Sequence, residues 1–283
     1  MHQSVLITGA SSGIGEATAI HLAHKGFRVF ATARREEKLK NLSGLGGGRI
    51  TPIEMDVTDE SSIEKALKKI ADEGVTLYGL VNNAGVSAMG PLERLSQTEW
   101  RGVFETNVFG LVAVTQALLP QMREAGRGRI VNIGSLTGRI ASPFQSAYAA
   151  TKHAVEGLSD SLRRELKPHG IKVSVVRPGA INTPFGHFEQ EMLTHYETDD
   201  VYGEQVKIFK AWFEKQHPSA PPPIVVAEAV HEALTAERPQ SRYTAPKSMT
   251  YAIALRNFLP SGATDRILER INGLDSFKKS RRN

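Results

Sequence analysis

The stretch SVLITGASSGIG, residues 4–15, joins a short apolar run to a cluster of glycines. The apolar run is typical of a buried strand, and residues 14–25 then repeat apolar side chains at helical spacing. A glycine-rich turn between a strand and a helix lets the backbone approach a pyrophosphate, which the amides and dipole of the helix stabilise. The stretch therefore predicts a dinucleotide site, although a tight turn without a ligand has the same pattern. The candidate cofactor contacts in this turn are Gly9, Ser11, Ser12, Gly13, Ile14 and Gly15.

Strands and helices alternate along the rest of the chain. Further strands are predicted at residues 27–33, 49–57, 77–85, 129–135 and 171–179, with helical patterns at 35–42, 59–73, 96–125, 146–167 and 226–237. Strands joined by such helices need crossover connections, so we expect a parallel sheet with helices on both faces. We predict a doubly wound, mostly parallel α/β sheet of the Rossmann type, in a single domain over residues 1–283. Ligands of such sheets bind beyond the carboxyl ends of the strands, where the strand order reverses.

Composition limits the class of protein. With 283 residues and 40% hydrophobic content, the chain is long enough to bury the core of one large domain. It contains no cysteine, which excludes disulfides, thiolate catalysis and cysteine-ligated metals. The N-terminus has no charged region followed by a cleavable apolar stretch, so we expect a cytoplasmic protein.

Membrane and nucleic acid partners are not expected. The most apolar stretch, residues 108–119, is interrupted by polar residues and a glycine and is shorter than the roughly 20 residues of a membrane span. The formal charge of +5 includes four cations near the C-terminus, at Lys278, Lys279, Arg281 and Arg282. A frayed, solvated tail explains this charge, and no pattern of a nucleic acid reader accompanies it.

The end of the second predicted strand carries the charges that distinguish NAD from NADP. The sequence there reads ATARREE, and Arg34 and Arg35 stand where an NAD site would hold a carboxylate for the ribose 2′-hydroxyl. The planar fork of arginine suits a 2′-phosphate instead. We therefore predict NADP(H) as cofactor, with Arg34 ahead of Arg35 because it lies nearer the strand. Two solvated arginines at the start of a helix are the alternative.

A tyrosine precedes a lysine by four residues in YAATK (148–152) and again in YTAPK (243–247). Helix-forming residues surround the first copy, so Tyr148 and Lys152 are expected on one face of a helix. In the second copy Pro246 disfavours a helix, and we predict a strand that leads into a turn. Only YAATK therefore presents a phenol and an ammonium together.

This pair of groups suits the reduction of a carbonyl. A phenol is a poor proton donor at neutral pH, and a nearby ammonium such as that of Lys152 lowers the pKa of Tyr148. Hydride transfer to a carbonyl develops charge on its oxygen, which needs a proton donor and a second hydrogen bond. Ser135, at the end of a predicted strand, is placed to give the second bond.

Six motifs follow one another between residues 4 and 183. They are TGASSGIG, NNAG at residues 82–85, Asn107 in ETNVFG, Ser135, YAATK and PGAINT at residues 178–183. In this order they resemble the motifs of the short-chain dehydrogenase/reductase family. The resemblance implies that Tyr148 is the catalytic acid/base, that Lys152 lowers its pKa and holds the nicotinamide ribose, and that Ser135 binds the substrate oxygen. Asn107 would sustain a water relay to the lysine.

The resemblance also implies cofactor contacts outside the glycine turn. The adenine would meet the segment at Asp56, NNAG would line the cofactor, and Thr183 would bind the carboxamide end. The implied contacts are Asp56, Val57, Asn82, Ala84, Gly85, Tyr148, Lys152, Pro178, Gly179 and Thr183. Structural roles stay open for three residues: Asn107 as a polar residue that kinks a helix, Asp56 as a turn or cap residue, and Thr183 as a loop hydroxyl.

Aromatic side chains are frequent in residues 183–223, which follow the last of these strands. A substrate lid would lie there, so we assign this segment to a substrate-binding lid and residues 246–283 to a C-terminal helical extension. The candidate substrate contacts are Ser135, Phe144, Phe185 and Phe188. Packing of the lid onto the core is the alternative, because several of its aromatics have helical spacing.

The sequence predicts an NADP(H)-dependent oxidoreductase that transfers hydride between the nicotinamide and a carbonyl or secondary alcohol. A lipophilic small molecule, such as a steroid, retinoid or long acyl chain, is the expected substrate. A reductase of small polar carbonyls, a cofactor-sensing protein without turnover and a nucleotide-sugar epimerase or dehydratase are the alternatives. No metal site is predicted, because the nine histidines are scattered, and a homo-oligomer is left open.

Overall fold

The computed structural model describes residues 3–216, 219–275 and 277. Within them seven strands form one sheet, in the order β3-β2-β1-β4-β5-β6-β7, and every neighbouring pair is parallel. The strands are β1 (Ser4–Ile7), β2 (Arg28–Ala33), β3 (Ile50–Glu54), β4 (Gly79–Asn82), β5 (Gly128–Ile133), β6 (Ile171–Pro178) and β7 (Arg242–Ala245). The order reverses between β1 and β4, so the predicted doubly wound fold is confirmed.

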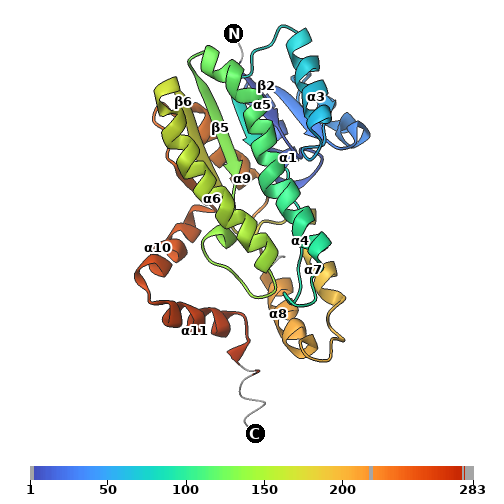
Figure 1. Cartoon of the computed structure of the whole chain (residues 1–283), viewed down its shortest axis with the longest axis vertical. Helices are drawn as coiled ribbons and strands as arrows, with labels where there is room; N and C mark the ends of the chain where they lie inside the picture. The colour runs from blue at the N-terminus through green and yellow to red at the C-terminus, as the bar shows by residue number, and fades with distance from the viewer. Residues whose placement is uncertain (1–2, 217–218, 276, 278–283) are drawn as a thin grey trace.

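Helices connect successive strands and cover both faces of the sheet. They are α1 (Gly13–His24), α2 (Lys40–Leu45), α3 (Glu60–Asp72), α4 (Gln97–Phe104), α5 (Leu111–Glu124), α6 (Ser146–Leu166), α7 (Pro184–Thr194), α8 (Gly203–Gln216), α9 (Ile224–Thr235), α10 (Thr250–Phe258) and α11 (Ser261–Ile271). Figure 1 shows α5 and α6 crossing in front of the sheet. Short 3-10 turns, among them η1 (Glu36–Leu39), η3 (Leu136–Gly138) and η5 (Lys247–Met249), complete the connections.

The alternation of side chains along the strands produces two apolar cores, one on each face of the sheet. Val5 and Ile7 of β1 are buried in the core that α1 and α9 cover. Leu6, between them, is buried in the opposite core, with side chains from α3 and α5. Because both faces are covered, the strands are fixed between two helical layers and their carboxyl ends form a rigid edge.

The helix predicted at residues 96–125 is interrupted by a π-helical turn, η2 (Glu105–Gly110), between α4 and α5. By length and composition the combined run Gln97–Glu124 qualifies to cross a membrane, whereas the sequence predicted no such segment. A buried core helix satisfies the same criterion, and this run packs Val114, Leu118 and Met122 into the core beside α3. A π turn inside a helix often marks a functional site, and Asn107 lies within this one.

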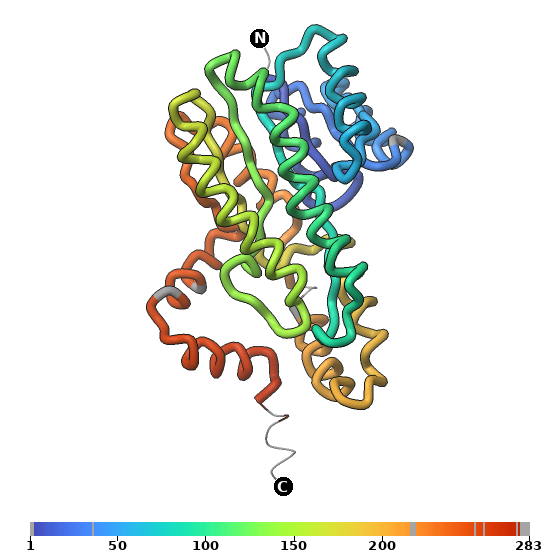
Figure 2. The backbone as a smooth tube through the Cα atoms, in the orientation of Figure 1, coloured from blue at the N-terminus to red at the C-terminus, as the bar shows by residue number. Residues whose placement is uncertain are grey.

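The last helices gather at the carboxyl end of the sheet. Figures 1 and 2 show α7, α8 and α11 at the end of the molecule toward which β5 points. The segment assigned as a lid folds as α7 and α8, and the described part of the C-terminal extension folds as η5, α10 and α11. The cationic tail, Lys278, Lys279, Arg281 and Arg282, lies outside the described residues.

Candidate active site

A cavity of about 760 Å³ opens along the carboxyl ends of the strands. Its wall contains residues that follow each of the six strands from β1 to β6, together with residues of α6, α7, α8 and α11. The sheet therefore brings segments that are far apart in the sequence to a single site at the position where strand order reverses.

The turn after β1 forms the floor of one part of this cavity, and Gly9, Ser11, Ser12, Gly13 and Ile14 line it. Gly9 and Gly13 have positive φ angles of 65° and 58°, which only glycine adopts without strain. A Cβ on Gly9 would lie 2.7 Å from the Cα of Ala84, so no larger residue fits. Gly15 is buried instead of lining the cavity, and a Cβ added to it would clash with the Gly9 carbonyl oxygen.

This turn has the features of a pyrophosphate cradle. Helix α1 begins at Gly13, and its N-cap, Ser12, makes no side-chain hydrogen bond to the first-turn amides. Those amides and the helix dipole are therefore available to an anion. The side chain of Asn83 donates to the carbonyls of Thr8 and Gly9, at 3.0 and 2.9 Å, and ties the turn to the end of β4. The residues present fit a nicotinamide dinucleotide.

The NNAG motif is divided between the core and the cavity. Asn83, Ala84 and Gly85 line the cavity. Asn82 does not: it is the last residue of β4, is 4% exposed, and donates to Asn132 and Thr115 at 2.9 and 3.0 Å. The prediction that Asn82 contacts the cofactor is therefore corrected to a structural role, and Asn83 takes its place at the cavity.

Two cations stand at the end of the cavity beyond β2. Arg34 lines it, as does Lys38 one turn later in η1, and both side chains are exposed to solvent. Arg35 is exposed as well but does not line the cavity, because adjacent residues point in different directions. Arg34, which the sequence ranked before Arg35, is the one of the two that lines the cavity, and Lys38 reaches it because the turn η1 brings it back to the end of β2.

Asp56 and Val57 line the same end of the cavity, after β3. The Asp56 carboxylate accepts hydrogen bonds from the backbone amide and the hydroxyl of Thr58, at 2.9 and 2.8 Å. Asp56 is thus a turn residue, one of the two roles left open by the sequence, and it also borders the cavity; its contact with the adenine stays a prediction.

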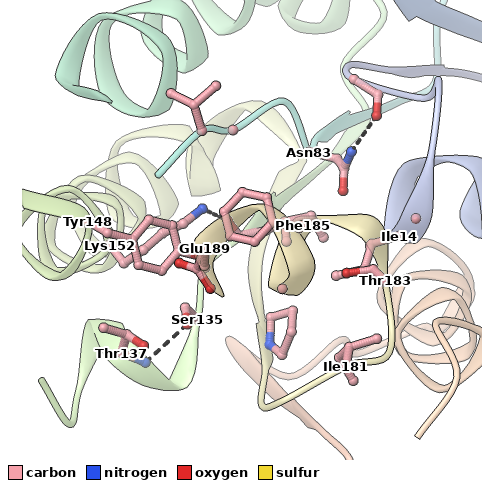
Figure 3. A pocket seen from close by; sticks show the side chains of 18 of the residues that line it. Ile14, Asn83, Ser135, Thr137, Tyr148, Lys152, Ile181, Thr183, Phe185 and Glu189 are labelled. Atoms are coloured by element: carbon pink, nitrogen blue, oxygen red, sulfur yellow. Dashed lines mark hydrogen bonds between the residues drawn. The ribbon is translucent and has the colours of Figure 1, made fainter. Parts of the chain in front are cut away.

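Tyr148 and Lys152 project from α6 into the cavity, one helical turn apart (Figure 3). The Lys152 Nζ lies 5.5 Å from the centre of the Tyr148 ring and donates to the carbonyl of Ile133 at 2.8 Å. Ser135 follows β5, and its side chain hydrogen bonds with Tyr148. Its Oγ also accepts from the amide of Thr137 at 3.1 Å, which orients the hydroxyl.

Burial controls the titration of this group. Desolvation lowers the pKa of Lys152 to about 8. Desolvation also raises the pKa of Tyr148, the nearby carboxyl of Glu189 raises it further, and the hydrogen bond with Ser135 lowers it. Burial and Glu189, an acidic residue that the sequence did not single out, therefore raise the pKa of Tyr148, whereas the sequence led us to expect a lowering by Lys152.

Asn107 lies behind the cavity wall and does not line it. Its side chain accepts from the amide of Val86 at 2.8 Å and donates to the Val86 carbonyl and to Thr151. A Cβ on Gly85 would lie 3.3 Å from the Asn107 Oδ1 and 3.9 Å from the Lys152 Nζ, so these groups surround the same glycine. The π turn thus holds Asn107 beside Lys152.

The segment after β6 closes the middle of the cavity. Pro178, Gly179 and Thr183 line it, and Thr183 packs within 3.3 Å of the position that a Gly13 Cβ would occupy. Phe185, in the first turn of α7, contacts the Tyr148 ring with the ring centres 5.8 Å apart.

Two of the predicted substrate contacts, Phe144 and Phe188, are not among the residues that line the cavity. Phe188 is 49% exposed, so its side chain is directed largely to solvent and not into the cavity. Phe144 has a positive φ angle of 60° and packs against the buried ring of Phe209, with the ring centres 5.5 Å apart. Phe144 is half-buried and packs against the core cluster that contains Phe209 of α8, while its neighbour Gln145 lines the cavity.

An acidic residue and an apolar wall complete the site; the sequence singled out neither the acidic residue nor the part of the wall that the C-terminal extension provides. Glu189 of α7 lines the cavity although it is only 5% exposed. Beyond it the wall is mainly apolar and combines α8 with the C-terminal extension. These wall residues are Trp212, Phe213, Met249, Leu268 and Ile271. The frequent aromatic side chains of residues 183–223 gave a signal for α8, whereas the extension carried no motif.

The second tyrosine and lysine pair lies apart from this site. Tyr243 is 5% exposed in β7, and its hydroxyl accepts from the amide of Gln240 at 3.0 Å. Lys247 points to solvent near Glu232. Among the residues that the structure describes, no cluster of three histidine or acidic side chains is arranged to hold a metal ion.

A parallel, doubly wound sheet with this cavity at its switch point defines a dinucleotide-binding α/β protein. The family model described as short chain dehydrogenase matches residues 3–194. The chain therefore belongs to the short-chain dehydrogenase/reductase family of oxidoreductases.

Curated relatives match along nearly the whole chain. The uncharacterized oxidoreductase YbbO of Escherichia coli (strain K12) is 35% identical over 279 residues, which cover 95% of each protein. Mitochondrial D-beta-hydroxybutyrate dehydrogenase of Bos taurus is 36% identical over 293 residues, which cover 94% of this chain and 83% of the relative.

Solved structures show the same fold with either nicotinamide cofactor. Serine dehydrogenase complexed with NADP+ is 32% identical with a TM-score of 0.74, over 86% of this chain and 94% of that one. A short chain dehydrogenase/reductase from Burkholderia phymatum in complex with NAD has a TM-score of 0.78 and 24% identity, over 90% and 93% of the chains. At 24% identity, the structure from Burkholderia phymatum supports only the assignment of the fold.

Proposed function

We propose that this protein is an NADP(H)-dependent oxidoreductase that interconverts a carbonyl and a secondary alcohol on a lipophilic small molecule. The main support for this proposal is that one cavity is lined by Arg34 and Lys38, by the glycine turn, by Tyr148 with Ser135 and Lys152, and by an apolar wall. A sensor without turnover would not need the proton donor, and an enzyme for small polar substrates would not need the wall.

The bound cofactor supplies or accepts a hydride. For the reduction, the Tyr148 hydroxyl donates a proton to the substrate oxygen, and the Ser135 hydroxyl gives that oxygen its second hydrogen bond. With a pKa of about 8, Lys152 is protonated at neutral pH, and its charge stabilises the phenolate that remains. Asn107 holds the backbone at Val86, beside that lysine.

The preference for NADP(H) rests on charge. A ribose 2′-phosphate next to Arg34 and Lys38 would meet two cations at the end of the cavity, whereas a 2′-hydroxyl would leave them without a partner. Asp56 lies after β3, one strand further, and its carboxylate is already engaged by Thr58. We therefore assign Arg34 to the binding of the 2′-phosphate.

The apolar wall supports the lipophilic substrate. We assign α7 and α8 to a lid over the reacting carbonyl, and α11 to the far wall against which an acyl or ring system packs. This assignment extends the predicted lid of residues 183–223 to include Leu268 and Ile271 of the C-terminal extension.

Titration of the protein with NADPH and NADH tests the cofactor assignment. Wild-type protein is expected to bind NADPH more tightly, and Arg34→Ala to weaken NADPH by roughly tenfold or more while NADH changes little, because one charge-assisted bond is lost. Arg35→Ala is the matched control and should leave both affinities nearly unchanged. Tighter binding of NADH than of NADPH by the wild-type protein would overturn the assignment.

A further inference from the structure

Glu189 is a buried carboxyl group in the part of the cavity where the carbonyl is proposed to react. It lies one turn after Phe185 on α7, and Phe185 contacts the Tyr148 ring. Figure 3 shows the Glu189 side chain directed toward Tyr148 and Ser135. The electrostatic influence of Glu189 on Tyr148 agrees with this proximity.

The partner of Glu189 is a neutral hydroxyl group. Its Oε1 accepts a hydrogen bond of 2.7 Å from Ser87, which is 4% exposed and follows the NNAG segment. Because Ser87 engages Oε1, the other carboxylate oxygen, Oε2, is left for the cavity that Glu189 lines. The group is therefore held in place by the protein but is only partly satisfied by it.

Another buried glutamate shows how this fold treats a structural carboxylate. Glu156 of α6 is also 5% exposed, and it pairs with Arg177 at 2.6 Å and with Arg242 at 3.1 Å. Burial of a carboxylate is costly unless it is paired with a cation. The described part of the chain provides two cations for Glu156 and a single hydroxyl for Glu189. Glu189 thus lacks the cationic partners that offset the cost of burying Glu156.

The cations that line the cavity are not paired with Glu189. Arg34 and Lys38 line its cofactor end, and Lys152 donates to the Ile133 carbonyl. The wall beyond Tyr148 contains apolar residues, including Phe185, some neutral polar side chains, and the Glu189 carboxyl. A ligand group beside Glu189 therefore meets a carboxyl acceptor that no cation of the described residues pairs with.

We infer that Glu189 is a specificity-determining residue that accepts a hydrogen bond from a donor group, a hydroxyl or an ammonium, on the substrate near its reacting carbonyl. The inference rests on the proposed function and narrows its substrate class to hydroxy- or amino-substituted lipophilic carbonyls. It also predicts discrimination against a carboxylate at that position, because two buried carboxylates repel each other. The substrate named for the D-beta-hydroxybutyrate dehydrogenase relative is thereby disfavoured for this chain.

A set of matched ketones tests the inference. The ketones share one chain length and carry a methyl, hydroxyl, ammonium or carboxylate group two or three bonds from the carbonyl. For each we would measure kcat/KM with NADPH, and also binding to the complex with oxidised cofactor, which cannot reduce a ketone. The wild-type protein should favour the hydroxyl or the ammonium ketone over the methyl ketone by roughly tenfold or more, in both measurements.

Two variants identify which donor is recognised. Glu189→Leu should remove the preference for either donor, whereas Glu189→Gln keeps a neutral acceptor and should preserve a hydroxyl preference while losing an ammonium preference. Glu191→Gln, on the exposed side of the same helix, is the matched control and should leave every ratio unchanged.

The outcomes separate this inference from the proposed function. Equal use of the methyl and donor ketones by the wild-type protein, a preference for the carboxylate, or an unchanged preference in Glu189→Leu would overturn the role of Glu189 alone. If none of the ketones is reduced and none binds, the proposed function fails, and the role of Glu189 fails with it.

Discussion

Three titratable side chains from two helices meet in the part of the cavity around Tyr148. Tyr148 and Lys152 come from α6 and Glu189 from α7. Burial favours the neutral form of each group: it raises the pKa of Tyr148 and of Glu189 and lowers the pKa of Lys152. Lys152 remains charged at pH 7 and loses its charge as the pH rises past about 8. The neutral form of Tyr148 is favoured before a substrate binds, which suits a group that donates a proton.

Glu189 makes the stability of the protein depend on pH. Desolvation raises the pKa of its carboxyl from 4.5 to about 7 in the folded protein. Between these values the folded state binds more protons than the unfolded chain, so the free energy of unfolding falls as the pH rises. At pH 8 the cost is of the order of 3 kcal/mol. We therefore expect Glu189→Gln to raise the free energy of unfolding, measured by denaturant titration, at pH 8 and to change it little near pH 4.5.

Glu156→Gln is the matched control for this measurement, because Glu156 is equally buried but ion-paired. Its removal leaves the guanidinium of Arg177 buried without a carboxylate, so we expect a loss of about 3–5 kcal/mol at pH 8. A loss of stability in Glu189→Gln at pH 8 would contradict the account of Glu189 as an uncompensated carboxyl.

At the scale of helices and strands, the sequence predicted correctly those elements that have a local sequence pattern. The glycine turn, the helix that carries YAATK and the strand at Tyr243 lie where their residues indicated. The helix at 96–125 was predicted without its π turn, because the turn is held by contacts of Asn107 with Val86 and Thr151. Contacts with other segments leave no periodic signal in the helix itself.

The apolar wall is likewise a property of elements that meet only in the fold. The aromatic segment suggested the wall, yet Phe209 is fully buried in the core, while Leu268 of α11 reaches the cavity. Helical spacing shows that Phe209, Trp212 and Phe213 share one face, but not what covers that face. The partner of each face is fixed by tertiary structure.

The contribution of α11 is testable with ketones of increasing chain length. In the wild-type protein kcat/KM should rise by up to about tenfold for each pair of buried methylenes, from about 0.8 kcal/mol apiece. Leu268→Ala should reduce this rise for the longer ketones, because part of the wall is removed. Leu255→Ala, in the exposed part of α10, is the control and should not. A series that is flat in the wild-type protein would mean that the substrate is small and the wall is packing.

At the scale of the whole molecule, the sheet decides which motif residues reach the site. Asn82 and Asn83 are adjacent, yet the first ends β4 inside the core and the second turns to the cavity. Glu189 is one of many glutamates on helices, and nothing in its local sequence distinguishes it. The fold class and the position of Tyr148 and Lys152 at the cavity were therefore predictable, since each has a local pattern, whereas the identity of wall residues depends on how helices pack beyond the strands.

Of the two tyrosine and lysine pairs in the molecule, only Tyr148 and Lys152 are proposed to take part in catalysis. Tyr148 lines the cavity with Ser135 and Lys152, whereas Tyr243 is buried in β7. The difference between the pairs comes entirely from the position of each helix or strand in the fold.

The most direct test is the rate of NADPH oxidation by a ketone substrate in Tyr148→Phe, with the affinity for NADPH measured in the same variant. The account predicts an affinity close to that of the wild-type protein and a turnover reduced by at least about 10²-fold, the lower range of acid–base contributions. Tyr243→Phe should retain its turnover. Undiminished turnover in Tyr148→Phe, or equal losses in the two variants, would contradict the central claim.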